Sequence, residues 1–366
     1  MVQSITNLPE RVDDDAATVS HWLGHVAGHY DADACARLAA AGELLLRCHG
    51  EERLETGESA ARHRLASADI LFDLRMDAET LCAALLQGCL GREGIDEALL
   101  AERFGAGLVR MATDLARIHH LTSVEYVAEG GKRAARNRRE HEENLRRMLL
   151  GIGEDVRVVL VVLADRLHLL RRSKHLARAR QLEIADDTRR VYAPLANRLG
   201  VWQIKWELED LALRATEPED YMRIARALSE RRNERQGYIA RVLELLRAEL
   251  AAAGIAAEVT GRPKHIYSIW RKMQRKGVDI DQIFDLRAVR ILVDDVPACY
   301  SALGVVHGLW RHIPSEFDDY IATPKGNQYQ SLHTAVIGPE DKPLEVQIRT
   351  HAMHEHAEYG VAAHWA

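Results

Sequence analysis

The sequence predicts a multidomain α and α+β fold, with an all-α part followed by a smaller part built on a mixed β-sheet. Two observations lead to this prediction. Before about residue 255, apolar residues recur at helical spacing and prolines are few, whereas after it apolar and polar residues alternate with a period of two. The composition agrees, because 47% hydrophobic and 28% charged residues over 366 positions can bury a core in two or three domains.

In the first half, helical spacing is clearest at residues 81–85, 145–149 and 158–170. Residues 156–163 are apolar on nearly every side, and their flanks read as helix, so we expect a central buried helix there. Residues 131–147 carry seven Lys or Arg residues among three glutamates. We interpret that segment as a solvated helix face with paired charges, in preference to a nucleic-acid site.

In the second half, the alternation predicts strands near residues 286–293 and 344–348, separated by turns at 294–297 and 338–341. A turn over residues 261–264 precedes an amphipathic pattern that ends at Met273, which predicts a helix. The unsatisfied N–H groups at the start of a helix favour phosphate.

One loop, residues 323–334, combines groups that suit a purine nucleotide. Lys325 and His333 can meet phosphate oxygens, and the ring of Tyr329 offers a face for base stacking. The amide of Asn327 can read a base edge with two hydrogen bonds. A loop of this kind binds a ligand, but it does not by itself supply a reaction.

Two further segments supply groups for phosphate chemistry. Arg262, Lys264 and Ser268 stand at the start of the expected helix, with Arg271 and Lys272 just beyond, and they form a candidate triphosphate cradle.

Asp285 and Glu345 are isolated acids within apolar runs. A carboxylate within a strand is unfavourable unless it is exposed, paired or bound to a metal. The two acids are therefore either ligands of a shared Mg²⁺ ion or two solvent-facing strand residues.

Charge and composition exclude several classes of protein. A net charge of −6 gives no general attraction to nucleic acid, so a small phosphate ligand is favoured over direct binding of a long polymer. The sequence contains no run of 18 apolar residues, so no membrane span is predicted.

His351, His354 and His356 lack a recognised metal-binding spacing, and we expect a surface or substrate-facing helix there. Five cysteines, an odd number without a C-x-x-C pair, are expected to be reduced thiols of a cytoplasmic protein.

The motifs of the second half resemble the synthetase domain of RelA/SpoT alarmone enzymes. The segments that carry the resemblance are residues 261–268, 284–290, 324–334, 344–350 and 360–365, with further similarity at 192–200 and 204–210 and a weaker one back to about residue 60. The resemblance implies a nucleotidyltransferase-like fold. It also implies transfer of the β,γ-pyrophosphate of ATP to the 3′-hydroxyl of GDP or GTP, which gives ppGpp or pppGpp and AMP.

The same resemblance implies residue roles on the ATP side. Arg262 would lie near adenine. Lys264 and Lys272 would bind the phosphates of ATP, and Ser268 would also contact these phosphates.

At the reaction centre, the resemblance implies that Asp285 binds Mg²⁺. Glu345 would complete the metal site and take the proton from the attacking hydroxyl. Tyr329 would stack on guanine and Asn327 would read its edge. The acceptor phosphates would contact Lys325 and His333.

Two features of the acceptor side distinguish this chain. Gly326 stands where the family usually has proline, and Gln328 where it usually has glycine. In addition, Glu316, Asp318 and Asp319 belong to an acidic motif that resembles the signature of synthesis-only RelA enzymes, which implies that GDP is used at least as well as GTP.

The first half resembles the family's HD-type hydrolase domain, but its metal site is degenerate. His63 and Asp165 stand at two of the expected Mn²⁺ ligand positions, whereas Gln87 and Gly88 replace a His-Asp pair. Residues 91–92, Gly and Arg, replace a Glu-Asp pair that serves catalysis. We therefore expect a pseudo-hydrolase with a regulatory role, in which the two remaining residues pack and hydrogen-bond like other buried polar groups.

These observations predict four parts: a tail at 1–20, the degenerate HD-type domain at 21–180, a helical connector at 181–235 and the synthetase domain at 236–366. We expect the chain to be part of a longer protein that contacts the ribosome through a C-terminal half. Two other functions are considered: a nucleotidyltransferase that transfers a nucleotidyl group, and a catalytically silent scaffold that senses nucleotides or docks on ribosomes.

Overall fold

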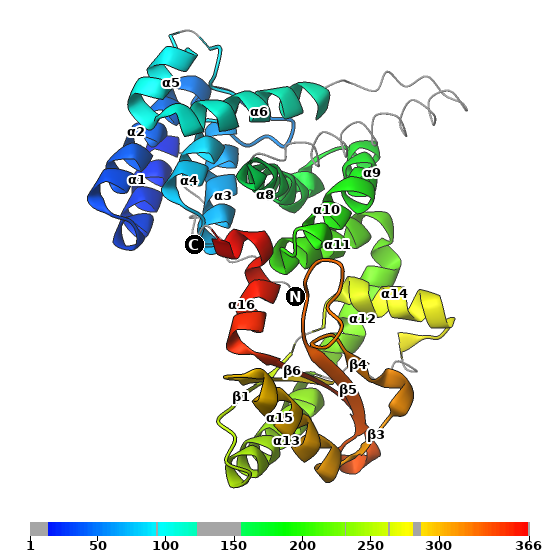
Figure 1. Cartoon of the computed structure of the whole chain (residues 1–366). Helices are drawn as coiled ribbons and strands as arrows, with labels where there is room; N and C mark the ends of the chain where they lie inside the picture. The colour runs from blue at the N-terminus through cyan, green and yellow to red at the C-terminus, as the bar shows by residue number, and fades with distance from the viewer. Residues whose placement is uncertain are drawn as a thin grey trace. The chain divides into compact units, whose positions relative to one another are not determined.

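The computed structural model describes residues 14–92, 94–122, 155–230, 232–262, 264–280 and 287–364. Three predictions lie outside these residues: the basic segment at 131–147, the helical pattern at 145–149 and the metal ligand Asp285. The chain divides into a helical unit, Val2–Ala196 with Val361–Ala366, and a sheet unit, Asn197–Gly360 (Figure 1). This boundary divides the predicted connector at 181–235 between the two units.

The helical unit is all-α in its described residues. Its helices are α1 (Asp15–Val26), α2 (Ala32–His49), α3 (Ala60–Asp73), α4 (Ala78–Leu85), α5 (Glu97–Phe104), α6 (Ala106–Thr122), α8 (Val156–Arg172) and α9 (Arg178–Asp187), and α10 (Ala193–Arg198) spans the boundary. The predicted central helix is confirmed, because α8 packs against α3, α4 and α6 and buries most of its side chains. Asp155 precedes the helix, and its side chain caps it by accepting from the N–H of Arg157.

The sheet unit contains a mixed sheet, as the sequence predicts. Its strands are β1 (Glu258–Gly261), β2 (Ala288–Val293), β3 (Arg311–His312), β4 (Asp318–Asp319), β5 (Leu332–Ile337) and β6 (Pro343–Thr350). The order is β1-β2-β6-β5-β3, with β4 also paired to β5. Only β2 and β6 run parallel among these pairs, and β6 lies in the centre between β2 and β5.

The two faces of this sheet differ in chemistry because side chains alternate along each strand. One face is apolar and packs against α13 (Arg232–Ala252) and α15 (Val296–Leu309). From β6, the side chains of Leu344, Val346 and Ile348 enter this core. Glu345, Gln347 and Arg349 therefore point to the other face, where the polar residues gather.

The predicted turn at 294–297 is shorter than expected. Asp295 caps α15 by accepting from the N–H of Ala298 at 2.8 Å, and Pro297 already lies in the first turn of the helix. Proline suits that place, because the first N–H groups of a helix have no partner within it. The turn residues therefore begin a helix.

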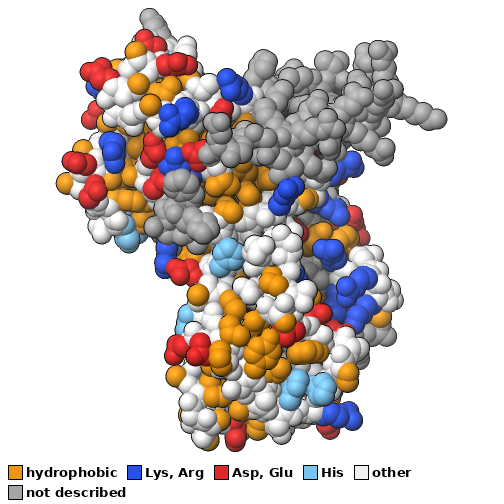
Figure 2. All heavy atoms as spheres, in the orientation of Figure 1, with side chains coloured by type: hydrophobic (Ala, Val, Ile, Leu, Met, Phe, Trp, Pro, Cys, Tyr) orange, Lys and Arg blue, Asp and Glu red, His pale blue; other side chains and the backbone are white. Residues whose placement is uncertain are grey.

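A second apolar cluster supports α14 (Ile266–Lys276), the amphipathic helix that the sequence predicts. Ile266, Ile269 and Met273 pack with residues of α11 (Trp202–Thr216) and α12 (Pro218–Glu230). The opposite side of α14 exposes a group of cationic residues, Arg271, Arg275 and Lys276. Figure 2 shows Lys and Arg side chains gathered where α14 lies. A chain with net negative charge thus carries a local basic surface.

Two general features bear on the class of protein. Within the described residues, no helix is both long and apolar enough to span a membrane. The five cysteines are free thiols, and three of them are buried: Cys82, Cys89 and Cys299.

Candidate functional site

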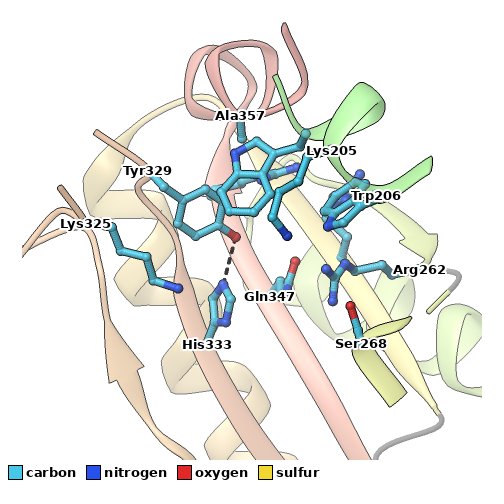
Figure 3. Close-up of a pocket in the computed structure, with 12 residues that line it drawn as sticks. Lys205, Trp206, Arg262, Ser268, Lys325, Tyr329, His333, Gln347 and Ala357 are labelled. Atoms are coloured by element: carbon cyan, nitrogen blue, oxygen red, sulfur yellow. Dashed lines mark hydrogen bonds between the residues drawn. The ribbon is translucent and has the colours of Figure 1, made fainter. Parts of the chain in front are cut away.

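Two neighbouring cavities lie on the polar face of the sheet unit. The larger, here called the tyrosine cavity, has a volume of about 200 Å³. Its lining residues are Trp202, Lys205, Trp206, Arg262, Ser268, Arg290, Lys325, Tyr329, His333, Gln347, Arg349 and Ala357 (Figure 3). The second, here called the lysine cavity, is lined by Arg262, Lys264, His265, Ser268, Ile269, Lys272 and Glu345.

The two cavities share Arg262 and Ser268, which belong to the start of the α14 region. The structure therefore brings together all four residues that the sequence assigns to the ATP side. Lys325, Tyr329 and His333 of the acceptor loop line only the tyrosine cavity, which they share with Arg262 and Ser268. Two adjoining sites with a common wall suit two ligands that must meet.

Glu345 is an acid among the residues that line the lysine cavity. Its Oε2 accepts from Nζ of Lys264 at 2.5 Å, and its Oε1 accepts from Nη1 of Arg262 at 3.3 Å. The residues opposite it on the two neighbouring strands, Ala288 and Ala335, are small and leave room for these long side chains. Burial opposes ionisation, but the charges of Lys264 and Arg262 outweigh it and lower the pKa of Glu345.

An ionised, buried carboxylate is the kind of oxygen ligand that Mg²⁺ prefers, so Glu345 fits the metal role that the resemblance implies. The other implied ligand, Asp285, lies outside the described residues. The alternative of two solvent-facing strand acids does not hold for Glu345, whose side chain is only 18% exposed.

Tyr329 and His333 form the acceptor side of the tyrosine cavity. The Tyr329 hydroxyl and Nε2 of His333 lie 2.8 Å apart, and the two rings are perpendicular (Figure 3). Burial lowers the pKa of His333 to about 4, so this imidazole is neutral at pH 7. It can bind a phosphate by donating a hydrogen bond, but it adds no positive charge.

Lys325 supplies the charge on this side. Its Nζ lies 4.1 Å from the centre of the Tyr320 ring and 5.3 Å from that of Tyr329. Burial lowers the pKa of Lys325, and the nearby cations Lys205 and Arg262 act in the same direction, whereas Asp318 opposes them. A bound phosphate would relieve this crowding of positive charge.

Asn327 is not among the residues that line either cavity. Its Nδ2 donates to the carbonyl oxygen of Asn197 at 3.0 Å, and its Oδ1 accepts from the N–H of Tyr329 at 3.4 Å. For Asn327 to read a base edge, these bonds must be exchanged. Its predicted role stays a prediction.

Of the two unusual loop residues, Gln328 carries backbone strain. Its φ is 62°, in the left-handed region that glycine adopts freely. Glycine is the residue that the resemblance implies at this position. Gly326 has no atom within 4 Å of an added Cβ, so nothing around it requires glycine.

The acidic motif lies beside the acceptor loop. Asp318 on β4 stands opposite His333 on β5. Asp319 has a structural role, because its carboxylate accepts from the N–H groups of Ile321 and Ala322 and from the Tyr300 hydroxyl. Glu316 pairs with Lys276 of α14 at 3.5 Å.

The sequence reasoning missed several lining residues. Arg290 and Arg349 share the carboxylate of Glu358, at 3.3 and 3.1 Å, and their Nε atoms are buried with no hydrogen-bond partner among the described residues. Burial and the charge of Arg349 lower the pKa of Arg290 to about 10. One signal in the sequence could have placed Arg290 and Arg349 on the polar face of the sheet: they alternate with core residues along their strands.

In the helical unit, the degenerate hydrolase positions form a closed network. His63 donates from Nδ1 to Glu58 at 3.0 Å and from Nε2 to Asp165 at 3.0 Å. The prediction that His63 and Asp165 hydrogen-bond within the domain is confirmed. Arg64, which sequence reasoning missed, donates from Nη1 to Gln87 at 3.1 Å and also contacts Asp165.

The residues present at this site therefore do not fit a hydrolase metal ion. A guanidinium occupies the space between Gln87 and Asp165, and Gly88 offers no side chain. Arg92, which replaces an expected acid, donates to the carbonyl oxygens of Gly88 and Cys48.

A different set of possible ligands does exist here. The ligand atoms of Glu58, His63 and His168 lie within 4.8 Å of one another. Both imidazoles already bond to the two oxygens of Glu58, at 3.0 and 3.1 Å.

The fold and these sites define a class of protein: an HD-type helical unit joined to a mixed-sheet unit with two adjoining cationic cavities. Residues 261–366 match the region found in RelA/SpoT proteins, and residues 41–202 match an HD domain. The chain belongs to the RelA/SpoT family.

Among its relatives, the GTP pyrophosphokinase of Photobacterium angustum (strain S14) is 46% identical over 302 residues, which cover 81% of this chain and 39% of the relative. The GTP pyrophosphokinase of Escherichia coli K12 is 47% identical over 300 residues, with the same coverage of 81% and 39%. A solved GTP pyrophosphokinase family protein from Streptococcus pneumoniae is 26% identical, with a TM-score of 0.30, and the match covers 35% of this chain and 71% of that one. The chain thus spans about two fifths of the length of these curated relatives.

Proposed function

We propose that this chain is an alarmone synthetase, which transfers the β,γ-pyrophosphate of ATP to the 3′-hydroxyl of GDP or GTP. The relatives named above are GTP pyrophosphokinases. The single observation that carries the proposal is the pair of adjoining cavities, with Arg262 and Ser268 in their common wall and the ionised Glu345 beside it.

On this proposal, ATP binds in the lysine cavity. Lys264 and Lys272 contact its phosphates, and Ser268 contacts these phosphates as well. Arg262 reaches the adenine base. The guanine nucleotide binds in the tyrosine cavity, where Tyr329 stacks on the base and Lys325 contacts the phosphates.

The reaction is a displacement at the β-phosphorus of ATP. The 3′-oxygen of the acceptor forms the new bond to that phosphorus, the bond from the β-phosphorus to the oxygen of the α-phosphate breaks, and AMP leaves. Glu345 takes the proton of the attacking hydroxyl, for which it must be ionised and close. In such a transfer the enzyme contributes alignment and charge neutralisation more than covalent chemistry.

Glu345 and Asp285 would hold Mg²⁺, which supplies charge neutralisation on the phosphates when bound. In the structure, Lys264 and Arg262 already neutralise Glu345. Binding of ATP phosphates would draw these two cations toward the ligand and free the carboxylate for its metal and proton roles.

We further propose that the helical unit is a hydrolase-inactive, regulatory domain, since Arg64 fills the space between Gln87 and Asp165. The protein would act in the cytoplasm, where ATP and guanine nucleotides are available. Contact with the ribosome would belong to parts of a longer protein outside this chain.

The test is one incubation with γ-labelled ATP, GDP and Mg²⁺, analysed for labelled ppGpp and for AMP. Formation of both in equal amounts supports pyrophosphate transfer. An unlabelled nucleotidyl product with release of labelled pyrophosphate would indicate a nucleotidyltransferase instead. Binding of both nucleotides without any product would indicate a silent nucleotide-sensing scaffold.

A further inference from the structure

Helix α11 supplies one wall of the tyrosine cavity, although neither family match covers it beyond its first residue. Trp202, Lys205 and Trp206 all line the cavity. They are spaced three and four residues apart, so they lie on one face of the helix. The Trp202 ring meets the Tyr329 ring at 5.6 Å with an angle of 65°, which places α11 directly against the acceptor side.

The charge of the cavity is unbalanced. Five cationic side chains line it, and its described lining includes no carboxylate; the cations are Lys205, Arg262, Arg290, Lys325 and Arg349. Arg262 has Glu345 as a partner, and two of the others share one carboxylate, that of Glu358. A site of this composition is completed by an anion with several charges.

Lys205 is held in place at the cavity. Its Nζ donates to Oε2 of Glu209 at 2.8 Å, and the two side chains are only 12% and 10% exposed. Burial raises the pKa of Glu209, and the charge of Lys205 opposes that rise. Figure 3 shows the ammonium group pointing into the cavity between Tyr329 and Gln347.

An ordinary pair of charges four residues apart on a helix lies at the surface and contributes a few tenths of a kcal/mol. This pair is different, because it is largely buried and its cation faces four others across a cavity. Across the cavity Lys205 repels Lys325 and helps to lower its pKa, although Lys205 itself is paired with Glu209. The arrangement makes sense when a polyanion lies between the two lysines.

We propose that Lys205 is a binding residue for the phosphates of the acceptor nucleotide, opposite Lys325. This inference rests on the proposed function and names a further residue of its acceptor site. The acceptor is favoured over ATP because Lys205 lines the tyrosine cavity with Tyr329 and is absent from the lining of the lysine cavity. Glu209 is its positioning residue, since it holds the ammonium group without reaching the cavity lining.

The test uses Lys205→Gln, whose amide can still donate to Glu209, so the packing of α11 is kept while the charge is lost. GDP binding to the full chain is measured by calorimetry without ATP, together with the KM for ATP and for GDP. We expect the Kd for GDP to rise about 10- to 100-fold, the range for loss of a charge-assisted hydrogen bond, and the KM for ATP to change less than about 3-fold. Lys205→Arg keeps the charge and should recover part of the affinity.

Arg311→Met is the matched control, because Arg311 is an exposed cation on β3 that lines neither cavity. It should leave the Kd for GDP unchanged. Thermal melting shows whether each variant is folded. If Lys205→Gln is unstable, Glu209→Gln replaces it, and a weaker hold on the ammonium should still raise the Kd for GDP several-fold.

The outcomes distinguish a failure of the proposed function from a failure of the proposed role of Lys205. Wild-type protein that binds neither GDP nor GTP would overturn the proposed function itself. Wild-type protein that binds GDP, with folded Lys205→Gln binding it equally well, would overturn only the role of Lys205. Equal losses for GDP and ATP would also contradict it, since they would mean a general effect on the site.

Discussion

Arg64 and Gln87 are joined by a hydrogen bond of 3.1 Å from Nη1 of the guanidinium to Oε1 of the amide, in the buried part of the helical unit. The same nitrogen contacts Asp165. A positive charge that belongs to the protein therefore lies between two of the positions where the family resemblance implies metal ligands. Asp165 is kept ionised by it, because the charges of Arg64 and His63 outweigh burial and lower the pKa of Asp165.

The first prediction is that the chain does not hydrolyse ppGpp. With purified protein, ppGpp, excess Mn²⁺ and no ATP, release of GDP and pyrophosphate should stay at background. Mn²⁺ should also leave the melting temperature of the wild type unchanged. Arg64→Ala should destabilise the helical unit by roughly 1.5 to 3 kcal/mol, because it removes a charge-assisted hydrogen bond from the half-buried Asp165.

Arg62→Ala, on the same helix but less buried, is the control and should cost far less. Sustained hydrolysis at a rate close to that of synthesis would show that the domain is active. A saturable rise in melting temperature with Mn²⁺ or Zn²⁺ would instead indicate that Glu58, His63 and His168 bind metal.

The second prediction concerns Glu345. Glu345→Gln keeps the volume but removes the charge, so turnover should fall by on the order of 100-fold or more. Loss of the carboxylate also frees Lys264 and Arg262 from their ion pairs, so binding of ATP should be retained or become tighter. Rapid-quench kinetics and equilibrium binding of ATP measure the two effects separately. Near-normal synthesis by this variant would remove Glu345 from the reaction.

The third prediction distinguishes base stacking by the ring of Tyr329 from the hydrogen bond between its hydroxyl and His333. Tyr329→Ala should raise the KM for GDP by about 5- to 100-fold, since base stacking contributes roughly 1 to 3 kcal/mol, and should affect the KM for ATP much less. Tyr329→Phe retains the ring and loses only the bond to His333, so its KM for GDP should stay near that of the wild type. Steady-state kinetics with each substrate varied in turn would test this. Equal effects of Tyr329→Ala on both nucleotides would contradict the assignment of the tyrosine cavity to the acceptor.

The fourth prediction concerns the choice between GDP and GTP. The double variant Glu316→Arg and Asp318→Lys changes the local charge by about four units beside His333 and Lys325. We expect the wild type to use GDP at least as well as GTP, and the variant to shift the ratio of kcat/KM toward GTP. Asp319 is left unchanged because its carboxylate holds the backbone that follows β4. A wild type that strongly prefers GTP would contradict the prediction.

The fifth prediction follows from the backbone at Gln328. Gln328→Gly should relieve the left-handed strain and raise the free energy of unfolding of the sheet unit by about 1 kcal/mol or slightly less, because the added chain flexibility offsets part of the gain. Gly326→Ala, two residues away, meets no atom within 4 Å and should be close to neutral. Denaturant titrations followed by tryptophan fluorescence compare the two. A destabilising Gln328→Gly would show that the Gln328 side chain supports the loop.

Much of the fold followed from local patterns. The buried helix α8, the amphipathic helix α14 and the alternating strands β2 and β6 are each encoded in residues that are neighbours in sequence, so their periodicity identifies them. The short strands β3 and β4 were missed, because two residues carry no periodicity. Asp285 remains a prediction from resemblance alone.

The sequence by itself determined the family, the two kinds of unit and most of the charged residues that line the cavities. Only the tertiary structure decided how these residues are paired. Lys264 meets Glu345 across 81 positions, Asn327 meets Asn197 across 130, and Arg64 meets Asp165 across 101. The physical reason is that local patterns report which face of an element is buried. The partner of a polar group on that face depends on which distant element packs there, and that is fixed only when the whole core forms.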